Sequence, residues 1–180
     1  MFERLPGQIA DTVGGVKRVL VTGMSGTGKS TVIRELAARG HRAVDADENG
    51  FSALVPAGED QLTGVGGGMD WVWREDRIEA LLDEQSTEDL FLSGCSPNQG
   101  WFYPRFDHVV LLTAPPEVLA ERLATRTTNA FGKDPGELAR SLELQRTIEP
   151  RLRRGADLEV VTTVPVPEVV DAILRHVAAS

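Results

Sequence analysis

Short apolar runs alternate with amphipathic segments along most of this chain. The apolar runs contain many Val, Ile and Leu residues and end in glycine, threonine or an acid, which is typical of buried strands. We expect strands over residues 17–23, 41–47, 89–94, 107–113 and 158–163. Between these runs, apolar residues recur at a spacing of three or four, which predicts helices. The expected helices cover residues 29–40, 70–84, 115–128, 135–154 and 167–178.

This alternation of strands and helices predicts the fold class. Strands that are apolar throughout and are separated by helices form a parallel sheet that is covered on both faces. A chain of 180 residues is long enough to bury one core, so we expect a single α/β/α three-layer domain over residues 1–180, with a five-stranded parallel sheet. Ligands of such sheets bind beyond the carboxyl ends of the strands, where the candidate site is therefore expected.

The stretch GMSGTGKS follows the first predicted strand and matches the pattern G-x-x-x-x-G-K-[ST]. Glycines let consecutive backbone N–H groups curl around phosphate oxygens, and the next helix presents its N-terminus to the anion. Lys29 is expected to contact the β- and γ-phosphates, and the Ser30 hydroxyl to bind a magnesium ion. The predicted nucleotide contacts are Gly23, Ser25, Gly26, Thr27, Gly28, Lys29, Ser30 and Thr31. The motif predicts a P-loop NTPase fold that binds ATP and Mg²⁺.

Two acids lie at the end of the second predicted strand. Asp45 and Asp47 are two positions apart, so their side chains point to the same side of that strand. Beside a phosphate-binding loop, one carboxylate can organise the magnesium shell while the other accepts the proton of an attacking hydroxyl. We assign Asp45 to the metal and Asp47 to the acceptor, and the pattern leaves open an exchange of these roles.

Composition and charge narrow the range of partners. The net charge of −8 argues against nucleic-acid binding, because phosphate backbones are bound by basic surfaces. No secretory signal pattern or apolar run of membrane-spanning length is visible, so we expect no membrane contact and a cytoplasmic location. Cys95 is the single cysteine, and His41, His108 and His176 are far apart and look structural. The sequence therefore shows no cage of protein ligands for a metal.

Taken together, these motifs resemble those of the nucleoside monophosphate kinase-like small-molecule kinases, a superfamily that includes adenylate, shikimate and gluconate kinases. The resemblance rests on GMSGTGKS, the D-x-D pattern at 45–47, WR at 73–74, DHVVLLTAPPEVLAERLATR and the closing ADLEVVTTVPVPEVVDAIL. It implies that Arg122 and Arg126, which follow the fourth strand, neutralise charge on the transferred phosphoryl group. It also implies a small lid-like segment at about 126–138.

On the nucleotide side, the resemblance implies that the loop after the last strand lines the adenine, with Thr163 and Pro165 as candidate contacts. On the acceptor side, it implies a segment at about 48–84 together with the end of the third strand. The candidate substrate contacts are Asp47, Arg74, Gly94 and Asn98. Arg74 matches an arginine that grips the acceptor carboxylate in shikimate kinase-like proteins, and a guanidinium suits such a planar anion.

The chain also departs from these relatives. Shikimate kinases carry a triple glycine after the third strand, whereas SGCSPNQG retains Gly94 alone. Relatives often have an arginine before the AD of the last strand, and Arg146 and Arg151 are near that place but out of register. In the polar loop at 96–106, Trp101 or Tyr103 is the candidate for stacking on a ligand.

The function expected from motif and resemblance is Mg²⁺-dependent transfer of the γ-phosphoryl group of ATP to a small-molecule acceptor. A nucleoside monophosphate and a small hydroxylated acid are the two leading acceptors. The alternatives are a nucleotide-dependent switch or regulatory ATPase that acts on a protein partner, and an ATP-binding module without catalysis. The resemblance further implies a monomer or a homodimer.

Overall fold

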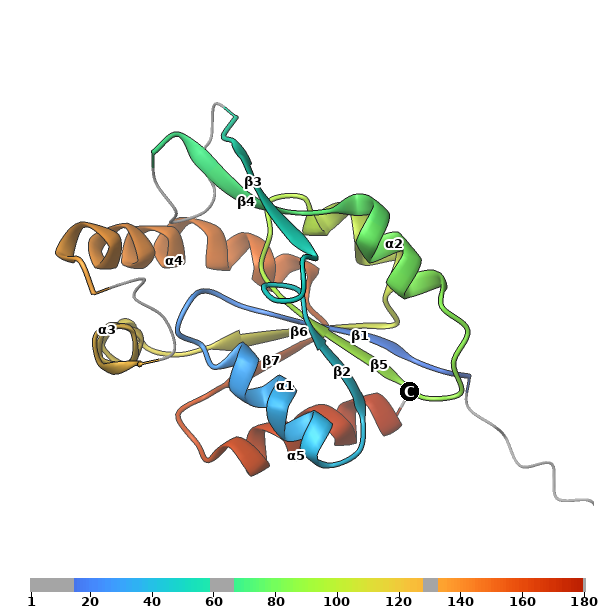
Figure 1. The fold of residues 1–180 in the computed structure, drawn as a ribbon. Coiled ribbons are helices and arrows are strands. Elements are labelled where there is room, and N and C mark those ends of the chain that lie inside the picture. Colours follow the sequence, from blue (N-terminus) through green and yellow to red (C-terminus); the bar gives the residue numbers. More distant parts are fainter. Residues whose placement is uncertain (1–14, 59–66, 128–132, 180) are drawn as a thin grey trace, which may run out of the picture.

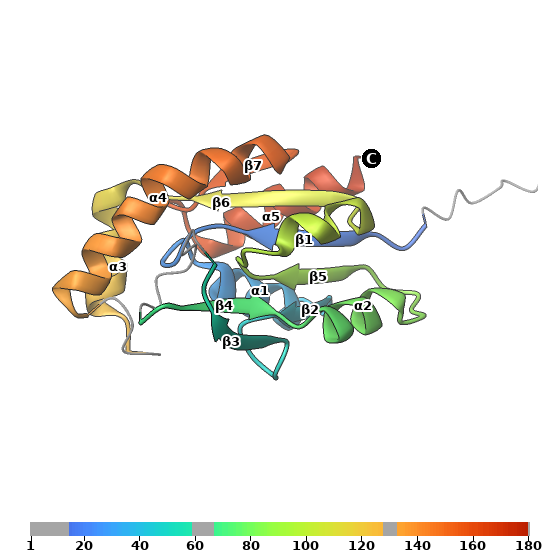
Figure 2. The ribbon, with the colours of Figure 1, turned by 90° about the horizontal axis from the view of Figure 1, so that it is seen from above.

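A computed structural model describes residues 15–58, 67–127 and 133–179 of the chain (Figure 1). Its centre is a parallel sheet with the strand order β2-β5-β1-β6-β7, and the strands lie side by side in that order in Figure 2. The strands are β1 (Arg18–Thr22), β2 (Arg42–Asp45), β5 (Leu90–Ser93), β6 (His108–Thr113) and β7 (Leu158–Val161). The predicted three-layer fold with a five-stranded parallel sheet is confirmed.

Helices cover both faces of this sheet (Figure 1). One face packs against α1 (Lys29–Ala38) and α5 (Val166–Ala178). The opposite face is covered by α2 (Glu75–Asp83), the 3₁₀ helix η1 (Gln99–Arg105) and α4 (Pro135–Gly155), while α3 (Pro116–Thr125) packs against α4. Among the described residues, no helix is long and apolar enough to cross a membrane.

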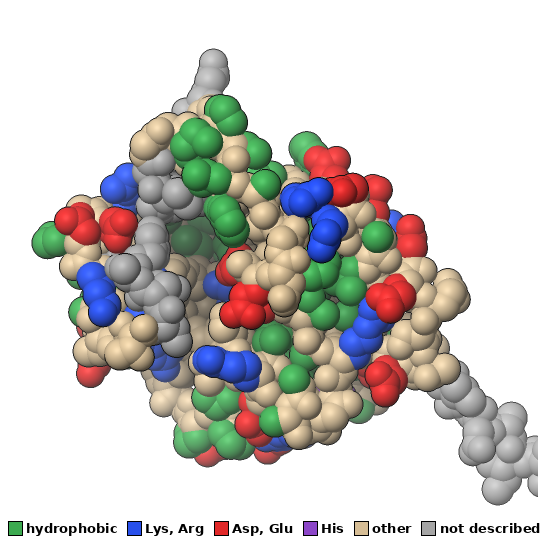
Figure 3. All heavy atoms as spheres, viewed as in Figure 1, with side chains coloured by type: hydrophobic (Ala, Val, Ile, Leu, Met, Phe, Trp, Pro, Cys, Tyr) green, Lys and Arg blue, Asp and Glu red, His purple; other side chains and the backbone are tan. Residues whose placement is uncertain are grey.

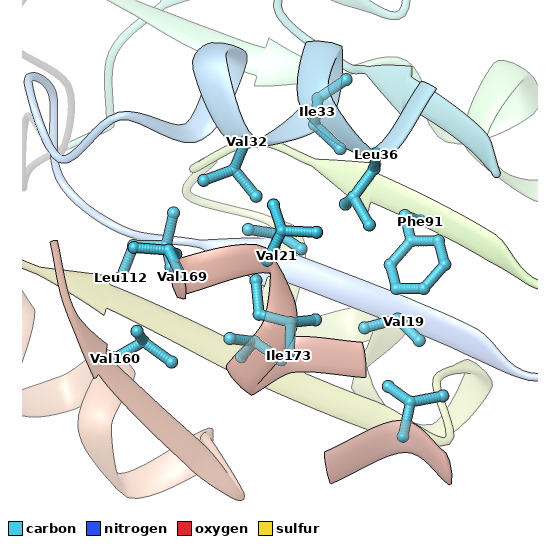
Figure 4. Close-up of a cluster of buried hydrophobic side chains, with 13 residues drawn as sticks. Val19, Val21, Val32, Ile33, Leu36, Phe91, Leu112, Val160, Val169 and Ile173 are labelled. Atoms are coloured by element: carbon cyan, nitrogen blue, oxygen red, sulfur yellow. The ribbon is translucent and has the colours of Figure 1, made fainter. Parts of the chain in front are cut away.

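The alternation of side chains along β1 explains how one strand contributes to two cores. Val19 and Val21 point to the α1/α5 face and pack against Leu36, Phe91 and Ile173 (Figure 4). Leu20 points the other way, into the core beneath α2 and η1. Since successive side chains of a strand lie on opposite faces, a strand that is buried on both faces is apolar throughout. The central strand is therefore held rigidly from both sides, and the loop at its carboxyl end is anchored.

One predicted element is wrong. Residues 70–84 form two elements instead of one helix, because residues 69–73 belong to strand β4 (Met69–Trp73), which pairs antiparallel with β3 (Ser52–Pro56). The buried side chains of Asp70 and Trp73 are three positions apart, which imitates a helical stripe, whereas the aromatic and β-branched residues of MDWVW favour a strand. The helix begins after Arg74, where Glu75 and Asp76 suit the first turn.

The sequence analysis also missed β3 and treated η1 as part of a polar loop. In Figures 1 and 2 the β3–β4 hairpin lies above the sheet on the side of β2, away from β7. Trp73 connects it to the core, because its indole is 2% exposed and packs with Phe102 at a ring-centroid distance of 5.9 Å. The hairpin thus forms one wall of the space above the carboxyl ends of the strands.

Candidate functional site: a phosphate-binding loop in a charged cleft

The loop between β1 and α1 has the geometry of an anion cradle. Gly26 and Gly28 have φ values of +88° and +95°, in the left-handed region that favours glycine. At Gly23 there is no space for a side chain, because a Cβ would lie 2.4 Å from the backbone oxygen of Leu112. Helix α1 begins at Lys29, directly after Gly28, so its free N–H groups face the loop. The sequence motif and the backbone conformation therefore agree.

Lys29 folds over this loop. Its ammonium group donates hydrogen bonds to the backbone oxygens of Gly23 (2.8 Å) and Met24 (3.3 Å), and the Thr27 hydroxyl donates to the Met24 oxygen at 2.8 Å. These contacts hold the charge of Lys29 inside the curve of the loop. The oxygens of a polyphosphate are stronger acceptors for an ammonium ion than backbone carbonyls are, so the lysine is placed to exchange one set of partners for the other.

A cleft of about 960 Å³ opens above the loop. Its walls come from the P-loop and α1, the end of β2, the hairpin, α3, α4 and the segment after β7. The lining includes Lys29, Ser30, Asp45, Asp47, Trp71, Cys95, Arg122, Arg126, Ser141, Leu144 and Thr162. In Figure 3 acidic and basic side chains face a common hollow. A cleft of this size and polarity suits a nucleotide together with a second small molecule.

The two acids at the end of β2 both line the cleft. Asp45 is buried, and its Oδ1 accepts a hydrogen bond from the backbone N–H of Asp47 at 3.1 Å. The Asp47 carboxylate is open to the cleft, yet its pKa is raised above its ordinary value, first because the protein around it displaces bulk water. Asp45 and Glu48 raise this pKa further, while Lys29 lowers it. Asp47 is therefore a stronger base than a free aspartate, whereas Asp45 is held in place.

Ser30 and Asp45 supply a hydroxyl and a carboxylate oxygen to the same cleft. Oxygen donors of this kind suit Mg²⁺, which is bound in proteins by one or two side chains together with phosphate oxygens and water. The donor set predicted from the sequence therefore fits the ion, and the pairing of Ser30 with Asp45 stays a prediction.

Arg122 and Arg126 lie on the α3 side of the cleft. The Arg122 guanidinium donates to the Thr162 hydroxyl at 2.9 Å, to the Thr162 backbone oxygen and to the Gly26 oxygen at 3.3 Å. It thus ties α3 to the P-loop and to the segment after β7. Burial lowers the pKa of Arg126, opposed by Glu137. Both arginines are close to the P-loop, and their expected role at the transferred phosphoryl group stays a prediction.

The segment after β7 lines the cleft through Thr162, Val164 and Val166. These are the neighbours of Thr163 and Pro165, the two residues that the sequence analysis selected. Pro165 lies instead at the N-cap of α5, and the described cleft lining includes neither it nor Thr163. The structure adds Thr162, whose hydroxyl also donates to the Thr113 backbone oxygen at 3.2 Å. No sequence motif marks Thr162, because its importance follows from the point at which β7 ends.

Three predicted acceptor contacts lie outside the described cleft lining. Arg74 is 46% exposed in its side chain and pairs with Asp76 at 3.4 Å. Asn98 is buried, and its amide donates to the Trp73 backbone oxygen at 3.0 Å. Gly94 packs against the Trp73 indole, which a Cβ would approach to 2.8 Å. Asn98 and Gly94 therefore pack around Trp73 and hold it in position. The acceptor roles of Arg74, Asn98 and Gly94 stay predictions.

Side chains from the hairpin, the loop after β5 and helix α4 also face the cleft. Trp71, Cys95, Ser141 and Leu144 line it. The Ser141 hydroxyl is buried and has no hydrogen-bond partner among the described residues. Burial raises the pKa of the Cys95 thiol, so this cysteine is a weak nucleophile. Sequence reasoning did not select these positions for the site.

The remaining sequence candidates lie elsewhere. Trp101 is 71% exposed, and the Tyr103 hydroxyl accepts a hydrogen bond from Gln99 at 2.8 Å. Arg146 pairs with Glu143 at 2.6 Å on α4, and Arg151 is exposed on the same helix. None of these four residues is in the described lining of the cleft. The lid-like segment at 126–138 falls partly outside the described residues, since 128–132 are not among them.

Fold and site together define a P-loop nucleotide-binding protein. The family model for an AAA domain matches residues 19–145, from β1 to the middle of α4, and the chain belongs to this family.

A curated relative is also described only as a nucleotide-binding protein. The chain is 32% identical over 167 residues to the nucleotide-binding protein GOX0815 of Gluconobacter oxydans. The match covers 90% of this chain but 47% of that protein, so the chain spans about half the length of its relative.

Solved structures of small-molecule kinases share the fold. A shikimate kinase from Acinetobacter baumannii, solved with shikimate, superimposes with a TM-score of 0.62 at 19% identity and covers 91% of this chain and 94% of its own. A gluconokinase from Sinorhizobium meliloti gives 0.56 at 22% identity, with 92% of each chain covered. A shikimate kinase from Bacteroides thetaiotaomicron gives 0.61 at 16% identity, with 90% and 98% covered. The chain therefore has a shikimate kinase-like fold.

Proposed function

We propose that this protein is an ATP-dependent phosphotransferase that moves the γ-phosphoryl group of ATP to a hydroxyl group of a small molecule. The observation that carries the proposal is the placement of Lys29, Arg126 and Asp47 around one cleft, with the pKa of Asp47 raised. A nucleotide-binding module needs the lysine but has no use for a base beside the phosphates. The likeness of fold to shikimate kinases and a gluconokinase supports the same reaction class.

In the proposed reaction the acceptor oxygen attacks the γ-phosphorus in line with the leaving ADP. The new bond joins the acceptor oxygen to phosphorus, and the bond from phosphorus to the oxygen between the β- and γ-phosphates breaks. Asp47 takes the hydroxyl proton, which a carboxylate with a raised pKa does at less cost than a free aspartate. Lys29 and Arg126 face the negative charge on the phosphates.

Magnesium, when bound by Ser30 and Asp45 together with phosphate oxygens, would neutralise part of the triphosphate charge. Arg122 acts in this scheme by holding the P-loop against Thr162, which keeps the nucleotide end of the cleft in shape. The hairpin and α4 supply walls of the same cleft, and exclusion of water from the phosphate by such walls would favour transfer over hydrolysis.

The test is transfer of label from γ-labelled ATP, with Mg²⁺, to a panel of hydroxylated compounds that includes shikimate and gluconate. AMP is tested beside them, because it would accept on a phosphate oxygen, and labelling of AMP alone would contradict transfer to a hydroxyl group. We expect a saturable acceptor that increases ADP release and becomes labelled. With Asp47→Asn, ATP binding stays and turnover falls by about 10²-fold or more. In the wild type, kcat/KM falls at low pH as Asp47 becomes protonated. Because the pKa of Asp47 is raised, this fall occurs at a higher pH than it would for an ordinary aspartate.

Two further results would contradict the proposal. The first is an unchanged turnover in Asp47→Asn, which would show that Asp47 is not the general base. The second is steady ATP hydrolysis that no member of the panel changes or receives label from, which favours the switch or regulatory ATPase instead. Asp83→Asn is the matched control, because this acid is exposed at the end of α2 and pairs with Arg105 outside the described cleft lining.

A further inference from the structure

Two histidines and an aspartate that are far apart in the sequence meet at the end of the sheet opposite the P-loop. His108 begins β6, Asp157 lies directly before β7, and His176 is in the last turn of α5. Parallel strands bring the starts of β6 and β7 together, and α5 runs back along the sheet so that its C-terminal end reaches the same edge (Figure 1). Their ligand atoms all lie within 4.8 Å of one another.

The spacing of these atoms is close to that of ligands around one metal ion. Asp157 Oδ2 is 3.0 Å from His108 Nδ1 and 3.1 Å from His176 Nε2. Ligands about 2.0–2.1 Å from a tetrahedral Zn²⁺ ion are about 3.3 Å apart. Separations larger by about 0.3 Å between the carboxylate oxygen and each nitrogen match these values, and Asp157 and His176, which are partly exposed, have the freedom to make this adjustment around the buried His108.

The surroundings hold the three groups in place. The second carboxylate oxygen of Asp157 accepts the backbone N–H of Val109 at 2.7 Å, which fixes the carboxylate as an outer-shell hydrogen bond does in metal sites. The two imidazole rings pack edge to face with centroids 5.1 Å apart. His108 is buried, and its Nε2 has no hydrogen-bond partner among the described residues. The polar contacts of this ring are thus concentrated on its Nδ1 side, toward Asp157.

We propose that His108, Asp157 and His176 form a binding site for Zn²⁺. Two imidazole nitrogens and one carboxylate oxygen are a donor set that suits zinc, whereas Mg²⁺ prefers oxygen donors alone. Asp157 and His176 are partly exposed, which leaves the solvent side open for water as a further ligand. The ion would join the starts of β6 and β7 to the end of α5, and so stabilise the fold without reaching the nucleotide cleft.

The test is calorimetric titration of the full chain, without a histidine tag and after chelator treatment, with ZnCl₂ in the presence of Mg²⁺. We expect one zinc per chain with a Kd in the micromolar range or tighter, and a thermal midpoint raised by about 5 °C or more at a large excess over Kd. Co²⁺ in place of Zn²⁺ is expected to give visible absorption bands from the bound ion.

Variants separate this site from adventitious binding. His176→Gln and Asp157→Asn are each expected to weaken zinc binding by at least about tenfold, and His176→Gln keeps the fold because its side chain is partly exposed. His41→Gln and Cys95→Ser remove the other histidine and the single thiol and are expected to leave the affinity unchanged. The proposal is overturned if no zinc binds at millimolar concentration, if His176→Gln binds zinc as the wild type does, or if His41→Gln or Cys95→Ser abolishes binding.

Discussion

Gly23 is required both by the packing of the sheet and by the P-loop motif. It lies where β1 passes into the P-loop, and an added Cβ would come within 2.4 Å of the Leu112 backbone oxygen and 2.8 Å of the Thr27 hydroxyl. Leu112 belongs to the neighbouring strand β6, so its backbone cannot move away without breaking the sheet. The first glycine of the motif is therefore required by close packing between strands, before any ligand binds.

Replacement of Gly23 by alanine tests this requirement. We expect Gly23→Ala to reduce the free energy of unfolding by about 2–4 kcal/mol, since overpacking and a left-handed φ both oppose the side chain. Urea denaturation followed by circular dichroism measures the change. Gly15→Ala is the matched control, because no atom lies within 4 Å of its added Cβ. Equal stability of the two variants would show that the loop can shift to accept a side chain.

At the scale of elements, the difference between what was predicted and what was missed has a physical cause. The central strands β5, β1 and β6 could be predicted because burial on both faces leaves a continuous apolar run such as RVLVT. The hairpin strands β3 and β4 are partly exposed, so they lack such a run, and the helical spacing of α2 extended the predicted helix backwards over β4. The hydrophobic pattern of a sequence indicates which residues are buried, and this pattern is weak in strands that are only partly buried.

Helix α4 carries the Ser141 and Leu144 wall of the cleft, and its start depends on one side chain. Asp134 is the N-cap, and its Oδ1 accepts the backbone N–H groups of Gly136 (2.8 Å) and Glu137 (3.2 Å). We expect Asp134→Ala to lower the free energy of unfolding by about 1 kcal/mol, whereas Asp134→Asn, which can still cap, loses less. Thermal denaturation of both variants beside the wild type measures this. An equal loss in both would assign the effect to charge instead of capping.

At the scale of the whole molecule, the sequence predicted one side of the cleft better than the other. Residues 24–31 of the P-loop, Asp45, Asp47, Arg122 and Arg126 all line it. The motif and the end of β2 specify the loop and the two acids, and the family resemblance indicated the two arginines. The rest of the lining depends on how the hairpin and α4 fold over the sheet, which brings in Trp71 and Ser141 through tertiary packing that no local pattern predicts. The zinc site proposed above arises in the same way, from residues that are separate in the chain and adjacent in the fold.

The central claim is that the loop from Gly23 to Ser30 binds the phosphates of a nucleotide. Isothermal titration of the protein with Mg²⁺–ATP tests this most directly, with Lys29→Ala as the variant and Lys17→Ala, at the other end of β1, as its control. We expect one saturable site in the wild type and in Lys17→Ala, and an affinity reduced by about 10²-fold or more in Lys29→Ala because the charge inside the loop is lost. Absence of binding heat in the wild type over a range of temperatures, or equal affinity in Lys29→Ala, would contradict the account.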